Sequence, residues 1–179
     1  YAKTKSASSV QWLVGDAENI PLQENSVDLI YSSLAIQWCQ NLPQFFVECQ
    51  RVLKPGGCLQ ISSLLPGTLN ELNSAWASVD DAVHVNPFDE LGVVKAAAKS
   101  AGLKVSSLVD VPHVVSYLKL KDLMADLKGI GAHNMNQGRS QGLLGKAKYQ
   151  KLIASYEAYR VNDTLPATYQ VLYGSFNNG

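Results

Sequence analysis

Short apolar runs alternate with amphipathic segments along most of this chain, and this alternation is the strongest constraint on its fold. The runs 27–31 and 58–65 predict buried strands, and the segment 41–53 between them has apolar residues at helical spacing. The proline and two glycines of 54–57 predict the end of that helix. A strand, a helix and a second strand in this order predict an α/β sheet with helices on both faces.

The other segments continue this pattern. The run 10–14 predicts a strand that ends in a turn at Gly15 and Asp16. Thr68 and Glu71 have the spacing of a capping box, which predicts the start of a helix. Helices are also predicted over 89–101, 120–130 and 146–160, and strands over 103–117 and 168–176. Because about fifty residues separate the last two strands, we expect them to pair antiparallel.

Composition favours one globular domain. The chain has 179 residues, of which 46% are hydrophobic and 17% charged, and its formal net charge is zero. The neutral total argues against a bulk nucleic-acid binder, and no apolar run approaches the roughly 20 residues of a membrane helix. No signal peptide is visible. Cys39, Cys49 and Cys58 show no CxxC spacing, so we expect buried thiols in a reducing, cytoplasmic compartment. The three histidines show no metal-ligand spacing.

The first residue bears on completeness. The chain begins at Tyr1, and its only methionines are Met124 and Met135. We therefore expect that an N-terminal part of the natural protein precedes it.

Polar and small residues follow two of the predicted strands, over 15–18 and 31–38. Ligands of open α/β sheets bind outside the carboxyl ends of the strands, so these two segments are the first candidates for a site. Together with 51–57, they resemble the middle of class I S-adenosylmethionine-dependent methyltransferases. The resemblance implies a Rossmann-like methyltransferase sheet whose first strands are absent from this chain and whose last two strands are antiparallel.

The segments 34–39, 69–80 and 127–139 sharpen the resemblance. They are similar to the malonyl-acyl-carrier-protein O-methyltransferases of biotin synthesis, and the similarity covers nearly the whole chain. This family methylates the free carboxylate of malonyl-acyl carrier protein. That carboxylate is ionised at neutral pH and is already the nucleophile, so proximity and alignment suffice without a general base.

The resemblance also implies roles for individual residues. Asp16 and Ala17 would contact the adenine of S-adenosylmethionine, and the backbone around Ser33 and Leu34 its methionine part. The alternative for Asp16 is a turn residue. The substrate would be bound by three residues, of which Arg139 is the candidate for the malonyl carboxylate or the carrier phosphate: Trp38, His133 and Arg139. Trp38 alternatively belongs to the core, and Arg139 to a solvated loop.

Charge is unevenly distributed along the chain. Residues 16–110 hold eleven acidic and five basic residues, a net of −6, whereas 119–151 hold seven basic and two acidic residues, a net of +5. Acyl carrier proteins are strongly acidic, so a basic C-terminal surface would steer one towards the site. Solvated helix faces are the alternative explanation. Two other functions stay open: a methyltransferase of other small molecules, and a catalytically silent binding protein of the same fold.

The family's glycine-rich cofactor loop would precede this chain, which contains no GxGxG. We expect one partial methyltransferase domain, with the remaining cofactor-side strands in about 1–66 and the substrate side in about 67–179. By family topology, the strand over 27–31 would then have an unpaired apolar edge. We expect this piece alone to bind S-adenosylmethionine poorly, and to form an oligomer if another chain supplies the missing strands.

Overall fold

A computed structural model describes residues 10–130 and 145–179 of the chain. Four strands form one mixed sheet in the order β1-β2-β4-β3. The pair β1–β2 is parallel, and both β2–β4 and β3–β4 are antiparallel. The structure thus confirms the predicted α/β class and the antiparallel last two strands.

The first half of the sheet is the predicted strand–helix–strand unit. β1 (Val27–Ser33) leads through a short 3₁₀ helix, η1 (Ile36–Trp38), to α2 (Leu42–Val52), and β2 (Leu53–Leu64) follows. Asn41 caps α2, because its side-chain oxygen accepts the N–H of Gln44 at 3.2 Å. α2 ends at Val52, just before the predicted 54–57 stop, and Gly56, at φ 78°, lies in β2 where its pairing with β1 shifts register.

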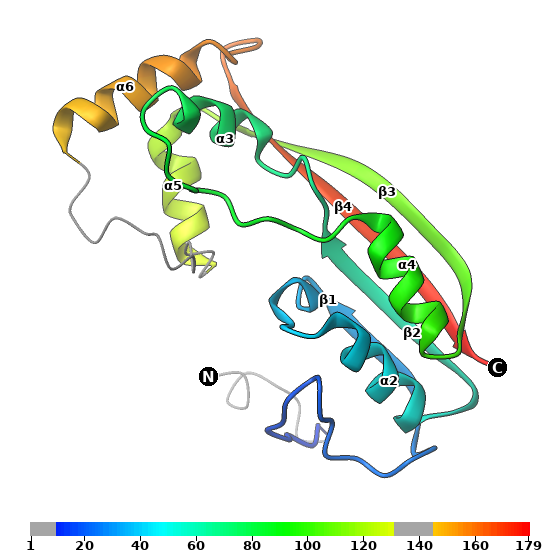
Figure 1. The fold of residues 1–179 in the computed structure, drawn as a ribbon. Coiled ribbons are helices and arrows are strands. Elements are labelled where there is room, and N and C mark those ends of the chain that lie inside the picture. Colours follow the sequence, from blue (N-terminus) through cyan, green and yellow to red (C-terminus); the bar gives the residue numbers. More distant parts are fainter. Residues whose placement is uncertain (1–9, 131–144) are drawn as a thin grey trace.

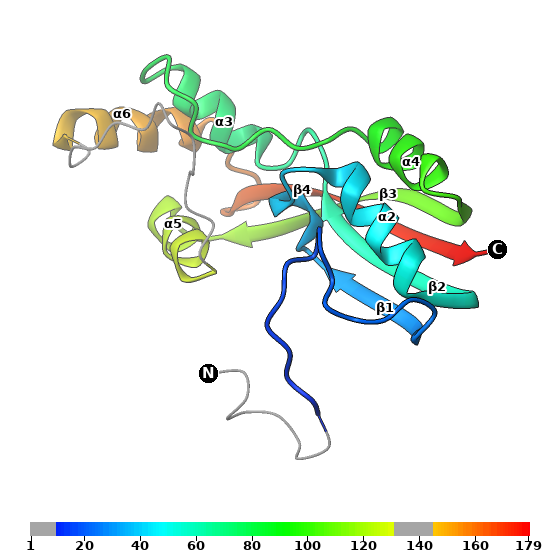
Figure 2. The same ribbon diagram turned by 60° about the horizontal axis from the view of Figure 1, so that its bottom comes forward.

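The second half contains two long strands and four helices. α3 (Asn70–Ala77) and α4 (Leu91–Ser100) precede β3 (Leu103–Tyr117), and α5 (Leu120–Gly129) and α6 (Lys146–Glu157) precede β4 (Leu165–Asn178). Figures 1 and 2 show α2 and α4 side by side on one face of the sheet. They show α3, α5 and α6 gathered around the far ends of β3 and β4.

The buried apolar side chains form two separate cores. The sheet core joins α2, α4 and the strands: Ile36, Leu42, Phe45, Phe46, Cys49, Leu53, Leu59, Ile61, Leu65, Val94, Ala97, Ala98, Leu103, Leu172 and Phe176. The cap core joins α3, α5 and α6 to the ends of the long strands: Leu69, Leu72, Ala75, Trp76, Leu120, Leu123, Leu152, Tyr156, Leu165 and Ala167. The chain therefore builds a sheet with a helical cap at one end.

The predicted strand over 10–14 is wrong. Residues 10–15 have no regular secondary structure, and Val14 is 98% exposed. An apolar run becomes a strand only when another strand supplies hydrogen-bond partners, and no described strand lies beside this one.

The capping box at Thr68 and Glu71 is also wrong. α3 begins at Asn70 after Leu69, whose φ is 55°, and Leu69 makes no side-chain cap bond. Thr68 Oγ1 instead accepts the N–H of Gln170 at 3.0 Å, and Glu71 Oε2 accepts the N–H of Thr168 at 3.1 Å. Both side chains thus bond to β4 and not to their own helix.

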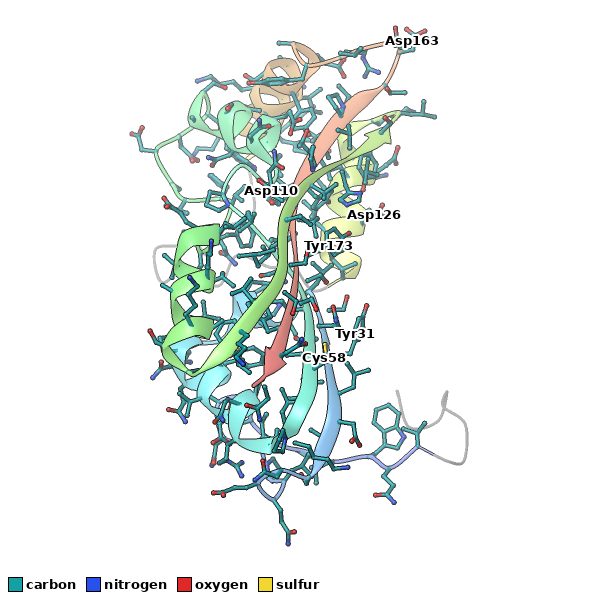
Figure 3. The ribbon with its side chains drawn as sticks, turned by 90° about the vertical axis from the view of Figure 1, so that its right-hand side faces the viewer. Tyr31, Cys58, Asp110, Asp126, Asp163 and Tyr173 are labelled. Carbon is teal, nitrogen blue, oxygen red and sulfur yellow. The ribbon has the colours of Figure 1, made fainter. Side chains whose placement is uncertain are left out.

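In the described part of the chain, no helix covers the face of β1 and β2 turned away from α2 and α4, so the expected helices on both faces are found here on one face only. Leu29 and Tyr31 in β1 and Tyr173 in β4 are 58%, 74% and 42% exposed. Figure 3 shows Tyr31, Cys58 and Tyr173 on this same side. β1 also ends the strand order, so the predicted unpaired apolar edge is confirmed for the described residues.

Two further expectations concern thiols and membranes. All three cysteines are free, but only Cys49 is fully buried, so the expectation of three buried thiols is wrong for Cys39 and Cys58, which are partly exposed. Burial raises the pKa of the Cys49 thiol to about 12.

No helix in residues 10–130 and 145–179 is long and apolar enough to cross a bilayer.

Candidate active site

The carboxyl end of β1 makes a tight turn against β2. Leu34 adopts φ 49°, a left-handed conformation that non-glycine residues rarely take. Its N–H donates to the carbonyl of Ser62 at 3.0 Å, and Ser62 Oγ donates to Ser33 Oγ at 3.3 Å. These bonds hold the turn in its strained conformation, as is common where backbone faces a ligand.

Gln37 of η1 clamps the same turn. Its Nε2 donates to the carbonyl of Leu34 at 2.8 Å, and its Oε1 accepts from Ser63 Oγ at 3.3 Å. One side chain therefore joins the exits of β1 and β2. Trp38 follows and is 47% exposed, so it does not belong to the buried core.

The segment that contains Asp16 lies beside η1. Asp16 Oδ1 accepts the N–H of Glu18 at 2.9 Å, and Glu18 Oε1 in turn accepts the N–H of Asn41 at 3.0 Å. Burial raises the pKa of the Cys39 thiol, and the nearby carboxylates of Glu18 and Asp16 raise it further. Asp16 is thus both a turn residue and a carboxylate close to the exit of β1.

Arg51 and Glu48 of α2 anchor this segment. Glu48 Oε2 accepts the N–H of Ile20 at 2.8 Å, while Arg51 donates to the carbonyls of Ile20 and Leu22, each at 2.8 Å. The hydrogen bond from Arg51 lowers the pKa of the Glu48 carboxyl, which therefore stays ionised. Arg51, part of the motif at 51–57, acts here as a structural link.

Two of the cavities in the described part of the chain lie where the sheet meets η1 and the cap. The first, of about 220 Å³, is lined by Ile36, Gln37, Cys39, Leu42, Ser63, Pro87, Phe88, Asp89 and Val94. The second, of about 90 Å³, lies where the sheet meets the cap and is lined mainly by apolar side chains: Trp38, Leu64, Thr68, Leu69, Leu72, His84, Val85, Asn86, Phe88, Leu127, Ile130 and Tyr169. We call the second one the cap cavity. Phe88 lines both, so the two cavities are neighbours.

His84 is the histidine in the wall of the cap cavity. Its Nε2 lies 2.7 Å from Asp80 Oδ1, and its ring stacks on Trp76 with centroids 3.6 Å apart and planes 8° apart. Lys148 of α6 donates to the other oxygen of Asp80 at 2.8 Å. The hydrogen bonds from Lys148 and His84 hold the pKa of the Asp80 carboxyl well below its usual range.

Tyr169, also in the cavity wall, belongs to a hydrogen-bonded group. Tyr117 of β3 bonds both Tyr169 and Asp126 of α5, and burial is the main reason why the pKa of Tyr117 is raised to about 12. Burial also raises the pKa of Tyr169. Both phenols therefore stay protonated at neutral pH and tie α5 to the long strands.

The structure brings most of the predicted site residues to one end of the sheet. Ser33 and Leu34 lie at the exit of β1, Trp38 lines the cap cavity, and Asp16 with Ala17 lies beside η1. His133 and Arg139 fall outside the described residues. Sequence reasoning missed His84, Phe88 and Tyr169. For His84, the four-residue spacing to Asp80 was a usable signal, whereas the other two had none.

In the described parts of the chain, no group of three or more His, Cys, Asp or Glu side chains has the arrangement of a metal site. The described region presents hydrogen-bonding groups, one carboxylate turn and an apolar cavity.

Comparison with known proteins adds sequence relatives. A family model described as "Methyltransferase domain" matches residues 1–61. The chain is 43% identical over 160 residues to a malonyl-[acyl-carrier protein] O-methyltransferase of Gallionella capsiferriformans, covering 89% of this chain and 55% of that protein. It is 44% identical over 173 residues to a biotin biosynthesis bifunctional protein BioHC of Cellvibrio japonicus, covering 97% of this chain and 34% of that protein.

Solved structures show the same fold. A putative methyltransferase of Bacillus halodurans superposes with a TM-score of 0.65 at 15% identity, over 98% of this chain and 74% of that one. The YcgJ protein of Bacillus subtilis gives a TM-score of 0.60 at 16% identity. The chain spans about half the length, or less, of the curated relatives that it matches.

Proposed function

Because this chain has the class I methyltransferase fold and is related over nearly its whole length to malonyl-[acyl-carrier protein] O-methyltransferases, we propose that its protein methylates the free carboxylate of malonyl-acyl carrier protein in biotin synthesis. The observation that carries the proposal is the extent of the similarity. At 43% identity, it spans 89% of the chain and so includes the cap as well as the sheet.

The residues at the exit of β1 suit S-adenosylmethionine. When bound, it supplies an electrophilic methyl group on a sulfonium. The Asp16 carboxylate accepts hydrogen bonds and sits in a turn beside Cys39, which suits the amino group of an adenine. Leu34 exposes a fixed, left-handed backbone next to the first cavity, where Ser33 and Leu34 would face the methionine part. Ala17 would contact the adenine ring.

Because the substrate carboxylate is already ionised, the reaction needs no general base. One oxygen of the malonyl carboxylate forms the new O–CH₃ bond with its lone pair, while the S–CH₃ bond breaks and leaves its electron pair on sulfur. Opposite charges vanish together in this step, so an apolar wall such as that of the cap cavity favours it. The chain's contribution is to align the two groups and to exclude water.

The segment 119–151, in which basic residues outnumber acidic ones, supplies a surface for the acidic carrier protein. Six of its lysines are described, and all six are exposed: Lys119, Lys121, Lys128, Lys146, Lys148 and Lys151. Lys148 is paired with Asp80, but the other five form no ion pair within the described residues. They lie in or directly before α5 and α6, two helices of the cap, whose cavity would take the acyl group. Arg139 and His133 would add contacts to the substrate from the segment between α5 and α6.

The direct test is methyl transfer from S-adenosylmethionine by the full-length protein. We expect labelled methyl to appear on malonyl-acyl carrier protein as a base-labile ester. Acetyl-acyl carrier protein, which lacks the free carboxylate, should remain unlabelled. Labelling of a free small acid in preference to the carrier would favour the small-molecule alternative. Binding of malonyl-carrier protein without any methyl transfer would favour the silent binding protein.

We also propose that the chain is part of one methyltransferase domain, in which about 1–66 bind the cofactor and about 67–179 bind the substrate. The protein would be cytoplasmic.

A further inference from the structure

We propose that His84 binds the carboxylate of the acyl group in the cap cavity by donating a hydrogen bond from Nδ1. This inference rests on the proposed function and adds a binding residue that the sequence pattern did not single out. It follows from the position of His84 in the cavity wall and from the hydrogen bond between its other ring nitrogen, Nε2, and Asp80.

The neighbours of His84 fix which ring nitrogen is left for a ligand. Asp80 is ionised and can only accept hydrogen bonds, so Nε2 carries a proton and donates to it over 2.7 Å. In residues 10–130 and 145–179, no side chain or backbone group bonds Nδ1. Stacking on Trp76 holds the ring plane, so Nδ1 has a defined position.

The charge balance around the ring suits an anion. Lys148 and Asp80 form an ion pair at 2.8 Å and neutralise each other. A carboxylate bound at Nδ1 therefore meets no unbalanced negative charge from this pair. The face of an indole attracts cations, so the stack on Trp76 also suits an imidazolium. Asp80, Lys148 and, across the cavity, Tyr169 are the titratable groups around this ring.

Other polar groups of the cavity already have partners. Thr68 Oγ1 bonds Gln170 in both directions, at 3.0 and 3.2 Å, and Tyr169 bonds Tyr117. The cavity volume of about 90 Å³ corresponds to about three water molecules. A three-carbon malonyl group is of this size. The carboxylate then presents one oxygen to His84 and the other to the methyl donor.

The experiment compares a charged ligand with a neutral one. For the full-length protein, affinities are measured for malonyl-acyl carrier protein and for its methyl ester, the neutral product. We expect His84→Asn to weaken binding of the malonyl form by about 10- to 100-fold, the effect of one charge-assisted hydrogen bond, and to leave the methyl ester unchanged. Affinity for S-adenosylmethionine should stay the same.

Matched variants separate binding from folding. His84→Phe keeps the ring stack on Trp76 and removes both nitrogens, so it should show the same selective loss if His84→Asn does not fold. His113→Asn, on the exposed face of β3, should change neither affinity. Equal losses for the malonyl form and the methyl ester in both His84 variants would overturn the assignment of His84 alone. Wild-type protein that transfers no methyl group to malonyl-carrier protein would overturn the proposed function and this inference together.

Discussion

The carboxylate of Glu71 in α3 accepts the backbone N–H of Thr168 in β4 at 3.1 Å, and it also accepts the Thr168 hydroxyl. β2 pairs with β4 only as far as Leu64 and Val171, so in the described residues the first part of β4, before Val171, has no strand on that edge. Glu71 and its neighbour Thr68 supply the missing partners. This contact fixes the helical cap to the end of the sheet.

Removal of the Glu71 carboxylate should loosen the cap. Glu71 is only 8% exposed, so Glu71→Ala leaves the N–H of Thr168 buried without an acceptor. We expect a loss of about 1–3 kcal/mol in the free energy of unfolding, measured by urea denaturation of the full-length protein. Glu71→Gln, which keeps an acceptor oxygen, should lose less. Glu24→Ala in an exposed loop is the control, and an equal loss there would contradict this reading.

Two glycines should respond in opposite directions to alanine. A Cβ on Gly174 in β4 would lie 2.7 Å from the Phe176 ring and 3.0 Å from Ile61, so Gly174→Ala should destabilise the protein by about 1–3 kcal/mol. Gly92 in α4 has open space around it, and Gly92→Ala should stabilise the protein by about 0.5–1 kcal/mol. Thermal unfolding measures both shifts. A stabilising Gly174→Ala would show that β4 packs differently.

Ionisation of Tyr117 should lower the stability of the fold at high pH. The pKa of Tyr117 is raised to about 12 in the folded state, above the usual value of about 10 for an unfolded chain. Its contribution to stability is therefore complete below about pH 10 and is lost as the pH rises through about 12. Tyr117→Phe should make the stability curve flatter over this interval and remove one late-titrating tyrosine from the ultraviolet titration. An unchanged titration would refute the assignment.

The lysines on the cap should matter for the carrier and not for a small substrate. Lys121 and Lys128 are seven residues apart in α5 and share one exposed face. Replacing both with glutamate should raise the KM for malonyl-carrier protein several-fold at low salt, and hardly change it for malonyl-CoA. The same double change at Lys95 and Lys99 of α4 is the control.

Salt gives a second measure of this surface. Association of wild-type protein with the carrier should slow steeply between low ionic strength and about 0.15 M, where the Debye length falls to about 8 Å. A flat response to salt would remove the case for electrostatic steering.

Periodicity and capping residues in the sequence were sufficient for most of the elements. The helix over 41–53, the strand over 103–117 and the end of the helix over 89–101 all appear in the structure within a few residues. These signals are local, because a helix face or a strand face that packs on a core repeats at its own period. The order of the motifs also predicted the methyltransferase sheet and its open β1 edge.

Contacts between distant segments were decided only by the tertiary structure. Thr68 and Glu71 match a local cap, but partly buried N–H groups of β4, about a hundred residues later, need acceptors and bond both side chains. The run over 10–14 has strand composition, but a strand needs a neighbour. The cap cavity is lined by residues of η1, α3, the segment around His84, α5 and β4. Sequence periodicity within one element cannot predict that these elements come together. The sequence by itself determined which faces are apolar, and tertiary packing decided which polar groups satisfy one another.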